Sequence, residues 1–175
     1  DMLVKALREV LGNRLKAVYD KSAKTLPDKA AIEPEDIYLF GNFSETVILE
    51  NNLKFKVNWE YGQKTGFFID QRENRRLVQE FAKNRDVLNM FGYTGGFSVY
   101  ALHGGAKKVH TVDASAKAID LTYENVAINF PEERRHEAFI ADAFEYLKEI
   151  QDKYDLIILD PPAFAKHHKV LANAL

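Results

Sequence analysis

Asn89-Met90-Phe91-Gly92-Tyr93-Thr94-Gly95-Gly96-Phe97-Ser98 is the stretch that decides the fold of this chain. The apolar run 86–91 predicts a short buried strand, and the residues from Gly96 to His103 predict a helix. Between them, glycines let the backbone turn sharply and approach a ligand, and a helix N-terminus offers free N–H groups. The spacing is Gly-x-x-Gly-Gly rather than the dinucleotide pattern Gly-x-Gly-x-x-Gly. The stretch therefore indicates either a nucleotide-type site or a plain strand-to-helix turn.

The chain repeats this strand-and-helix rhythm on both sides of the glycine turn. Further strands are predicted at 108–112, 138–141 and 154–159, with helices over 70–84, 115–129 and from Asp142. The first of these helices is expected to turn Leu77, Val78 and Phe81 inward. Parallel strands need crossover connections, so four strands separated by helices predict a doubly wound α/β fold.

The residues before this region have a different pattern. Apolar residues recur at helical spacing within 1–14, which predicts a helix that stops at Gly12, and 21–36 is a polar connection. The runs 45–50 and 53–59 alternate like strands, and only Asn51-Asn52 separates them, which predicts a hairpin. We therefore expect two domains, a small α+β module at 1–65 and the α/β domain at 66–175.

Acidic residues follow two of the predicted strands. Asp113 lies 21 residues beyond Gly92, where a carboxylate at a strand tip can accept hydrogen bonds from ribose hydroxyls. Its alternative role is to start the next helix, in competition with the potential cap Ser115. Asp142 could accept a hydrogen bond from an adenine amino group or cap the helix that follows, and both interpretations stay open.

The most specific motif is Leu159-Asp160-Pro161-Pro162-Ala163-Phe164, directly after an apolar strand. Two prolines can continue neither a helix nor a central strand, so the chain must leave the sheet stiffly. This fixes Asp160 at the edge where open α/β sheets bind ligands, and Phe164 could stack on a base.

Taken together, these four features resemble the class I S-adenosylmethionine-dependent methyltransferase family, whose core is Rossmann-like. One departure is Asn89, because a common form of the first motif has an acid just before its glycines. The resemblance implies S-adenosylmethionine as cofactor, with S-adenosylhomocysteine as product. The implied cofactor contacts in this part of the chain are Phe91, Gly92, Tyr93, Thr94, Gly95, Asp113, Ala114, Asp142, Ala143 and Asp160, and the implied substrate-positioning residues are Asp160, Pro161 and Phe164.

A narrower resemblance rests on the run 62–75, Gly-Gln-Lys-Thr-Gly-Phe-Phe-Ile-Asp-Gln-Arg-Glu-Asn-Arg. It is similar to a signature of bacterial large-subunit ribosomal RNA methyltransferases of the 5-methylcytosine type and of their guanine-N7-modifying relatives. The resemblance implies a cytoplasmic enzyme with ribosomal RNA as partner and Gln63, Lys64, Thr65 and Gly66 in the cofactor pocket. Arg72 would lie near that pocket, whereas the residues alone predict a solvated face for Arg72, Arg75 and Arg76, with phosphate contact as the alternative.

The chain contains no cysteine, although methylation of cytosine carbon 5 needs a nucleophile that adds to the ring. Family members of this type use a late cysteine, and their fold has seven strands rather than four. We therefore expect the nucleophile beyond Leu175, and a guanine nitrogen, N7 or N2, is the alternative target. The rival classes are a nicotinamide-dependent oxidoreductase and a non-catalytic RNA-binding or dimerising fragment.

Composition limits the partners. Hydrophobic residues make up 46% of the chain and charged residues 29%, as in a folded globular protein, and the net charge of −2 requires any RNA contact to be local. No apolar run reaches the ~20 residues of a membrane helix. His167-His168 without a nearby carboxylate predicts a solvated tail rather than a metal site. We expect no membrane and no metal, and a homodimer is one arrangement to test.

Overall fold

The computed structural model describes residues 2–23, 35–62 and 65–162. These form two compact units, one made by the described parts of 2–46 with 57–67, and the other by 47–56 with 68–162. Phe164 and His167-His168 lie outside the described residues, as does most of the polar connection 21–36.

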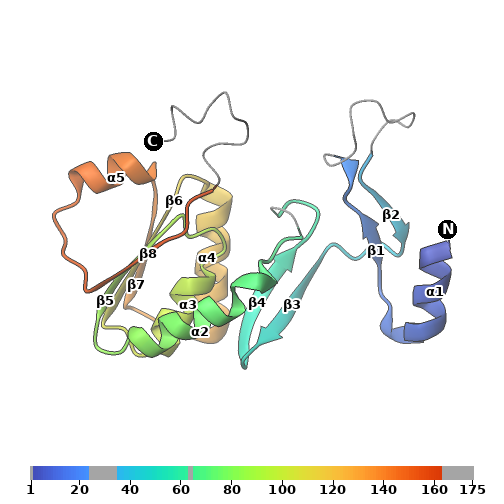
Figure 1. Cartoon of the computed structure of the whole chain (residues 1–175), viewed down its shortest axis with the longest axis horizontal. Coiled ribbons are helices and arrows are strands. Elements are labelled where there is room, and N and C mark those ends of the chain that lie inside the picture. Colours follow the sequence, from blue (N-terminus) through green and yellow to red (C-terminus); the bar gives the residue numbers. More distant parts are fainter. Residues whose placement is uncertain (1, 24–34, 63–64, 163–175) are drawn as a thin grey trace. The chain divides into compact units, whose positions relative to one another are not determined.

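The N-terminal unit begins with helix α1 (Met2–Leu11), which continues as a short 3-10 turn over Gly12–Arg14. Gly12 ends the α-helix in a left-handed conformation with φ of 54°, as expected of a glycine at a helix C-terminus. Strands β1 (Val18–Asp20) and β2 (Ile37–Phe40) then pair antiparallel (Figure 1). Neither strand was predicted from the sequence.

Strands β3 (Glu45–Glu50) and β4 (Leu53–Asn58) form the predicted two-stranded hairpin. Asn51 and Asn52 make its turn with φ of 50° and 66°, the positive values that such two-residue turns require. Within the second unit, Asn125 and Asn129 of helix α4 (Ala116–Asn129) hydrogen-bond the backbone of Lys54 and Lys56. These side-chain amides satisfy backbone groups of β4, a strand that pairs only with β3 among the described strands.

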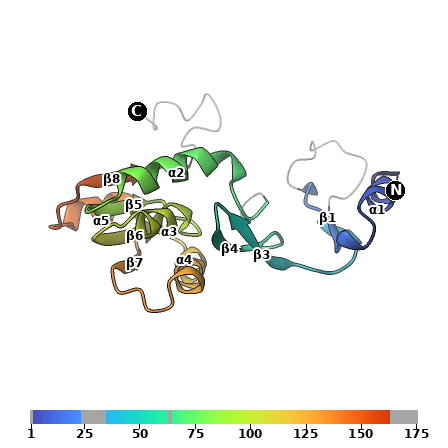
Figure 2. The ribbon, with the colours of Figure 1, turned by 90° about the horizontal axis from the view of Figure 1, so that it is seen from below.

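The second unit is a four-stranded parallel sheet with helices between the strands, which confirms the predicted α/β fold. Its strands lie in the order β7-β6-β5-β8, as Figure 2 shows. Its elements are a 3-10 turn (Ile69–Gln71), α2 (Arg72–Phe81), β5 (Asp86–Met90), α3 (Gly96–His103), β6 (Lys108–Asp113), α4 (Ala116–Asn129), β7 (His136–Ile140), α5 (Ala143–Glu149) and β8 (Leu156–Leu159).

Both faces of the central strands carry apolar side chains. Leu88, Met90 and Val112 pack with Ala143 at the start of α5, and Val87 and Val109 are fully buried as well. Strands buried on both faces read as continuous apolar runs, as 86–91 does in the sequence. The run 154–159 is equally apolar, but Ile157 and Leu159 in β8 are exposed. None of the described helices is long and apolar enough to cross a membrane.

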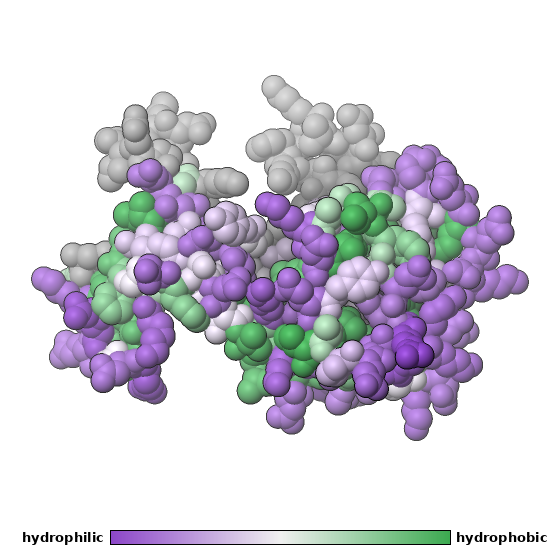
Figure 3. Space-filling model, turned by 180° about the vertical axis from the view of Figure 1, so that it is seen from behind, coloured by the Kyte–Doolittle hydropathy of each residue, from purple (hydrophilic) through white to green (hydrophobic). Residues whose placement is uncertain are grey.

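The predicted inward face of α2 is wrong for two of its three residues. Leu77 is 41% exposed and Phe81 is 54% exposed, Val78 is half-buried, and Arg75 is only 3% exposed. Arg75 faces inward because Glu50 offers a carboxylate there, so the predicted solvated face for this arginine is wrong too. Figure 3 shows apolar groups set among polar side chains on one face of the surface.

Candidate functional site

The carboxyl ends of the four parallel strands meet at one edge of the sheet. Met90 is in register with Val112 and with Leu159, and Val112 with Phe139. The glycine turn and Asp113, Asp142 and Asp160 therefore all follow strand ends at the same edge. Open α/β sheets bind their ligands at this edge.

Backbone hydrogen bonds, one of them to strand β6, hold the glycine turn. Phe91, Tyr93 and Gly95 have φ of 55°, 47° and 72°, so three of five consecutive residues adopt the left-handed conformation. The N–H of Gly92 donates to the carbonyl of Val112 (3.0 Å), and the N–H of Gly95 donates to that of Gly92 (2.8 Å). The turn delivers the chain into α3, whose first N–H groups lie at the ligand-binding edge.

Packing also requires two of these glycines. A Cβ on Gly92 would lie 2.2 Å from Cγ2 of Thr111, and one on Gly95 would lie 2.5 Å from Cγ2 of Thr122. Thr94 is buried, and its carbonyl accepts from Nδ2 of Asn125 (2.9 Å). The structure thus gives the glycines a packing role whether or not a ligand is bound.

Asp113 links the tip of β6 to the glycine turn. Its Oδ2 accepts from the N–H of Tyr93, and its Oδ1 accepts from the N–H of Ser115, both at 2.9 Å. An ionised carboxylate has about four acceptor positions, so each oxygen keeps capacity for one more donor. The half-buried carboxylate therefore fits a ribose with two hydroxyl donors. Ser115, not Asp113, caps α4, because its Oγ accepts from the N–H of Ala118.

Asp142 caps α5. Its Oδ1 accepts from the N–H of Phe144 (2.9 Å) and of Glu145 (3.2 Å), which leaves Oδ2 as an acceptor at the sheet edge. The capping interpretation is confirmed, and the adenine contact stays a prediction. Of the neighbouring predicted residues, Ala143 is buried and Ala114 is exposed.

Asp160 and Pro161 directly follow the end of β8, and both residues are exposed to solvent. Nε2 of Gln71 lies 3.4 Å from Oδ2 of Asp160, so the start of α2 reaches this carboxylate. Gln71 belongs to the run 62–75 but was not among the predicted site residues. Its amide can hold Asp160 in one orientation.

The remaining predicted cofactor residues belong to the other unit. Gly66 has φ of 88°, and a Cβ there would lie 2.6 Å from the carbonyl oxygen of Asn58. Oγ1 of Thr65 donates to the carbonyl of Phe67 (3.2 Å). Gln63 and Lys64 lie outside the described residues.

A buried polar network runs beneath the glycine turn. Nδ2 of Asn89 donates to Oγ of Ser98 (2.9 Å), this oxygen lies 2.7 Å from Oγ1 of Thr111, and Thr111 lies 2.9 Å from Nε2 of His136. Burial lowers the pKa of His136 to about 4, and the nearby His110 acts in the same direction. Asn89 lies close to where a common form of the first motif has an acid. Here its amide is part of a neutral network that joins β5, α3, β6 and β7.

A second buried cluster was missed by the sequence analysis. Nε and Nη2 of Arg75 each donate to one carboxylate oxygen of Glu50 at 2.8 Å. The hydroxyl of Tyr100 donates to the same carboxylate (3.0 Å), and burial with this contact raises the pKa of Tyr100 to about 12. Nη1 of Arg75 also donates to the carbonyl of Phe68, whose ring meets Tyr93 edge-on at 5.5 Å. Through Phe68, the cluster therefore contacts and supports the glycine turn at Tyr93.

In the described part of the chain, no three metal-ligating side chains come together. The edge instead offers carboxylates, a strained backbone turn and a helix N-terminus. The carboxylates match a ligand with hydroxyl and amino donors, such as a nucleoside, and the free N–H groups of the helix match an acceptor on that ligand.

Comparison with known proteins gives the family. A family model described as S-adenosylmethionine-dependent methyltransferase matches residues 22–175. A protein of Methanocaldococcus jannaschii named "Putative ribosomal RNA large subunit methyltransferase" is 43% identical over 100% of this chain and 45% of its own length. Ribosomal RNA large subunit methyltransferase I of Alteromonas mediterranea is 40% identical over 90% of this chain and 41% of its own length.

This chain is also similar to a solved methyltransferase structure. The crystal structure of "a putative methyltransferase complexed with SAH" is 32% identical, with a TM-score of 0.78 over 94% of this chain and 42% of that chain. This chain spans less than half the length of the relatives it matches. The match to the family model covers most of the chain, and the chain therefore belongs to the S-adenosylmethionine-dependent methyltransferase family.

Proposed function

We propose that this chain forms the cofactor-binding part of a cytoplasmic methyltransferase that acts on ribosomal RNA of the large subunit, at carbon 5 of a cytosine. The names of the relatives support the RNA substrate. The observation that carries the cofactor assignment is Asp113, whose carboxylate is fixed by Tyr93 and Ser115 and keeps acceptor capacity at the strand edge.

The residues of this edge would divide the work of binding. Asp113 would accept from the ribose hydroxyls, Oδ2 of Asp142 from the adenine amino group, and the turn from Phe91 to Gly95 would hold the methionine part. When bound, S-adenosylmethionine supplies an electrophilic methyl group on a sulfonium. Asp160, held by Gln71, would orient the acceptor base together with Pro161 and Phe164, so that the two reactants meet in line.

Calorimetric titration of S-adenosylmethionine into the chain tests the cofactor assignment. Asp113→Asn keeps the shape of the side chain but removes its charge and half of its acceptors. A hydrogen bond to a charged group contributes about 1.5–3 kcal/mol, so we expect binding to weaken by about 10- to 150-fold.

Asp120→Asn is the matched control, because Asp120 is an exposed acid within α4 and does not follow a strand end. NAD⁺ titrated in parallel addresses the oxidoreductase alternative. Equal affinity of wild type and Asp113→Asn for S-adenosylmethionine, or binding of NAD⁺ alone, would refute the assignment. Binding of RNA without either cofactor would favour a non-catalytic RNA-binding fragment.

The target atom needs a separate test with the longer protein. Methyl transfer to carbon 5 requires a nucleophile that adds to carbon 6, and since this chain has no cysteine, we propose that this nucleophile lies in the rest of the protein. In RNA with 5-fluorocytidine, fluorine replaces the hydrogen that must leave as a proton, so the enzyme stays covalently attached. A stable complex on a denaturing gel would support carbon 5, whereas methylation without such a complex would point to a guanine nitrogen.

A further inference from the structure

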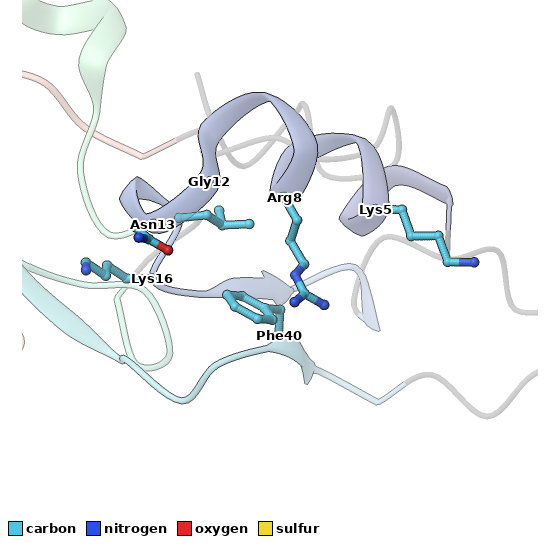
Figure 4. A pocket seen from close by; sticks show the side chains of 7 residues that line it. Lys5, Arg8, Gly12, Asn13, Lys16 and Phe40 are labelled. Carbon is cyan, nitrogen blue, oxygen red and sulfur yellow. The ribbon is translucent and has the colours of Figure 1, made fainter.

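The N-terminal unit contains an open cavity of about 720 Å³ that the proposed methyl transfer does not use (Figure 4). It lies between α1, the turn after it and strand β2. Its lining residues are Lys5, Arg8, Gly12, Asn13, Leu15, Lys16 and Phe40. We call it the basic cleft.

The basic cleft has three cationic side chains and no acidic one. Lys5, Arg8 and Lys16 are exposed, and none of them forms an ion pair with a residue in the described part of the chain. The whole chain carries a net charge of −2, so this concentration of positive charge is local. Exposed cations without carboxylate partners lose little when an anion binds, because no existing pair has to break.

An aromatic ring fixes the central cation. The guanidinium of Arg8 lies 5.0 Å from the centre of the Phe40 ring, which is half-buried in β2. Figure 4 shows Arg8 extending from the helix toward Phe40, with Lys5 and Lys16 on opposite sides of this pair. A guanidinium stacked on a ring keeps its N–H donors directed outward, and these match phosphate oxygens in a bidentate geometry.

We propose that the basic cleft binds the phosphodiester backbone of the RNA substrate, with Arg8 on one phosphate and Lys5 and Lys16 on neighbouring phosphates. This inference rests on the proposed function only in taking RNA as the substrate. A positively charged groove combined with an aromatic side chain is how proteins follow single-stranded RNA without reading its sequence. The cleft would therefore supply affinity rather than base specificity.

The test is fluorescence anisotropy of a labelled single-stranded RNA of about 16 nucleotides, titrated with the chain at several salt concentrations. Each phosphate contact contributes about 0.7 to the slope of log K against log salt, so three contacts predict a slope near −2. The triple variant Lys5→Gln, Arg8→Gln, Lys16→Gln should lose most of this slope and bind at least tenfold more weakly. Phe40→Leu should weaken binding less, because it removes the support of Arg8 but no charge.

Arg14→Gln is the matched control, since Arg14 is exposed in the same unit but does not line the cleft. Circular dichroism and calorimetry with S-adenosylmethionine are measured on every variant, so that loss of folding or of the cofactor site is seen separately. Unchanged slope and affinity in the triple variant would overturn the inference, as would an equal loss in Arg14→Gln or no RNA binding by a wild-type chain that binds cofactor. If the triple variant loses RNA binding while the wild type binds no cofactor, the RNA-binding role of the basic cleft is supported and the proposed methyltransferase function fails.

Discussion

Gly92 shows how a single residue can serve packing and ligand approach together. Its missing side chain makes room for Cγ2 of Thr111, which would lie 2.2 Å from a Cβ at this position. Thr111 also takes part in the network beneath the turn through its hydroxyl. A larger residue at 92 would push β6 and the glycine turn apart.

We predict that Gly92→Ala lowers the free energy of unfolding by about 1–3 kcal/mol, the usual cost of overpacking. Thr111→Ser removes Cγ2 and keeps the hydroxyl, so the double variant should recover part of this loss. Urea unfolding of the two single variants and the double variant gives the coupling energy. Additive losses would contradict the proposed clash.

His136 adds a pH dependence at the same scale. Its pKa in the fold is about 4 against an ordinary value of 6.5, because burial disfavours the charged ring. As pH falls below 6.5, the unfolded chain takes up the proton and the folded chain does not, so stability is lost between about pH 6.5 and pH 4.

Between pH 6.5 and pH 4, the free energy of unfolding should fall in the wild type by up to about 3 kcal/mol more than it falls in a His136→Gln variant. Urea unfolding at several pH values measures the difference between the two proteins. His110, whose pKa burial also lowers, remains in both proteins and drops out of the comparison. Parallel pH curves would show that His136 does not titrate as buried.

At the scale of elements, the buried pair Glu50–Arg75 joins β3 of the hairpin to α2. Their side chains are only 7% and 4% exposed, and Tyr100 of α3 donates to the same carboxylate. Removing one partner of a buried pair leaves an uncompensated charge, which costs about 3–5 kcal/mol, whereas replacing both by apolar residues can be nearly neutral.

We predict a loss of this size for Arg75→Met and recovery of most of it in the double variant Glu50→Leu, Arg75→Met. Arg76→Met is the control, because Arg76 is half-exposed on the same helix and pairs with Glu73 and Glu80 on the surface. Urea unfolding measures all three. A loss in Arg75→Met no larger than that in the control would contradict a structural role for the pair.

Elements set by local residues could be predicted from the sequence, whereas the burial of this pair could not. The hairpin, α4 and the four parallel strands could be predicted because Asn51-Asn52, Ser115 and the apolar runs act locally. The inward face of α2 could not, because Arg75 is buried by an acid 25 positions earlier in the chain. The alternation in β3 did place Glu50 on the same face as Ile48, and a buried acid needs a partner, which was the available signal. Strands β1 and β2 are only three and four residues long, too short for a periodic pattern.

At the scale of the whole molecule, the strand-end acids were predictable because each follows an apolar run. Their contacts were not predictable, because the hydrogen bond from Tyr93 to Asp113 joins residues 20 positions apart, and that from Gln71 to Asp160 spans 89 positions.

The sheet also has an edge where a partner could bind. In β8, Ile157 is 55% and Leu159 is 62% exposed, whereas Ile158 between them is 8% exposed. Strand β8 is at the end of the described sheet, and an exposed apolar edge strand favours association.

We predict that the chain self-associates in sedimentation velocity as its concentration rises and that Ile157→Thr reduces this association. The variant should change the free energy of unfolding by less than about 0.5 kcal/mol, because Ile157 is already more than half exposed. Ile158→Thr is the matched control and should cost about 2 kcal/mol, since it buries a hydroxyl and leaves a cavity. A wild-type chain that stays monomeric at all concentrations would contradict the role of this edge, and equal costs for the two variants would mean that β8 does not present Ile157 to solvent.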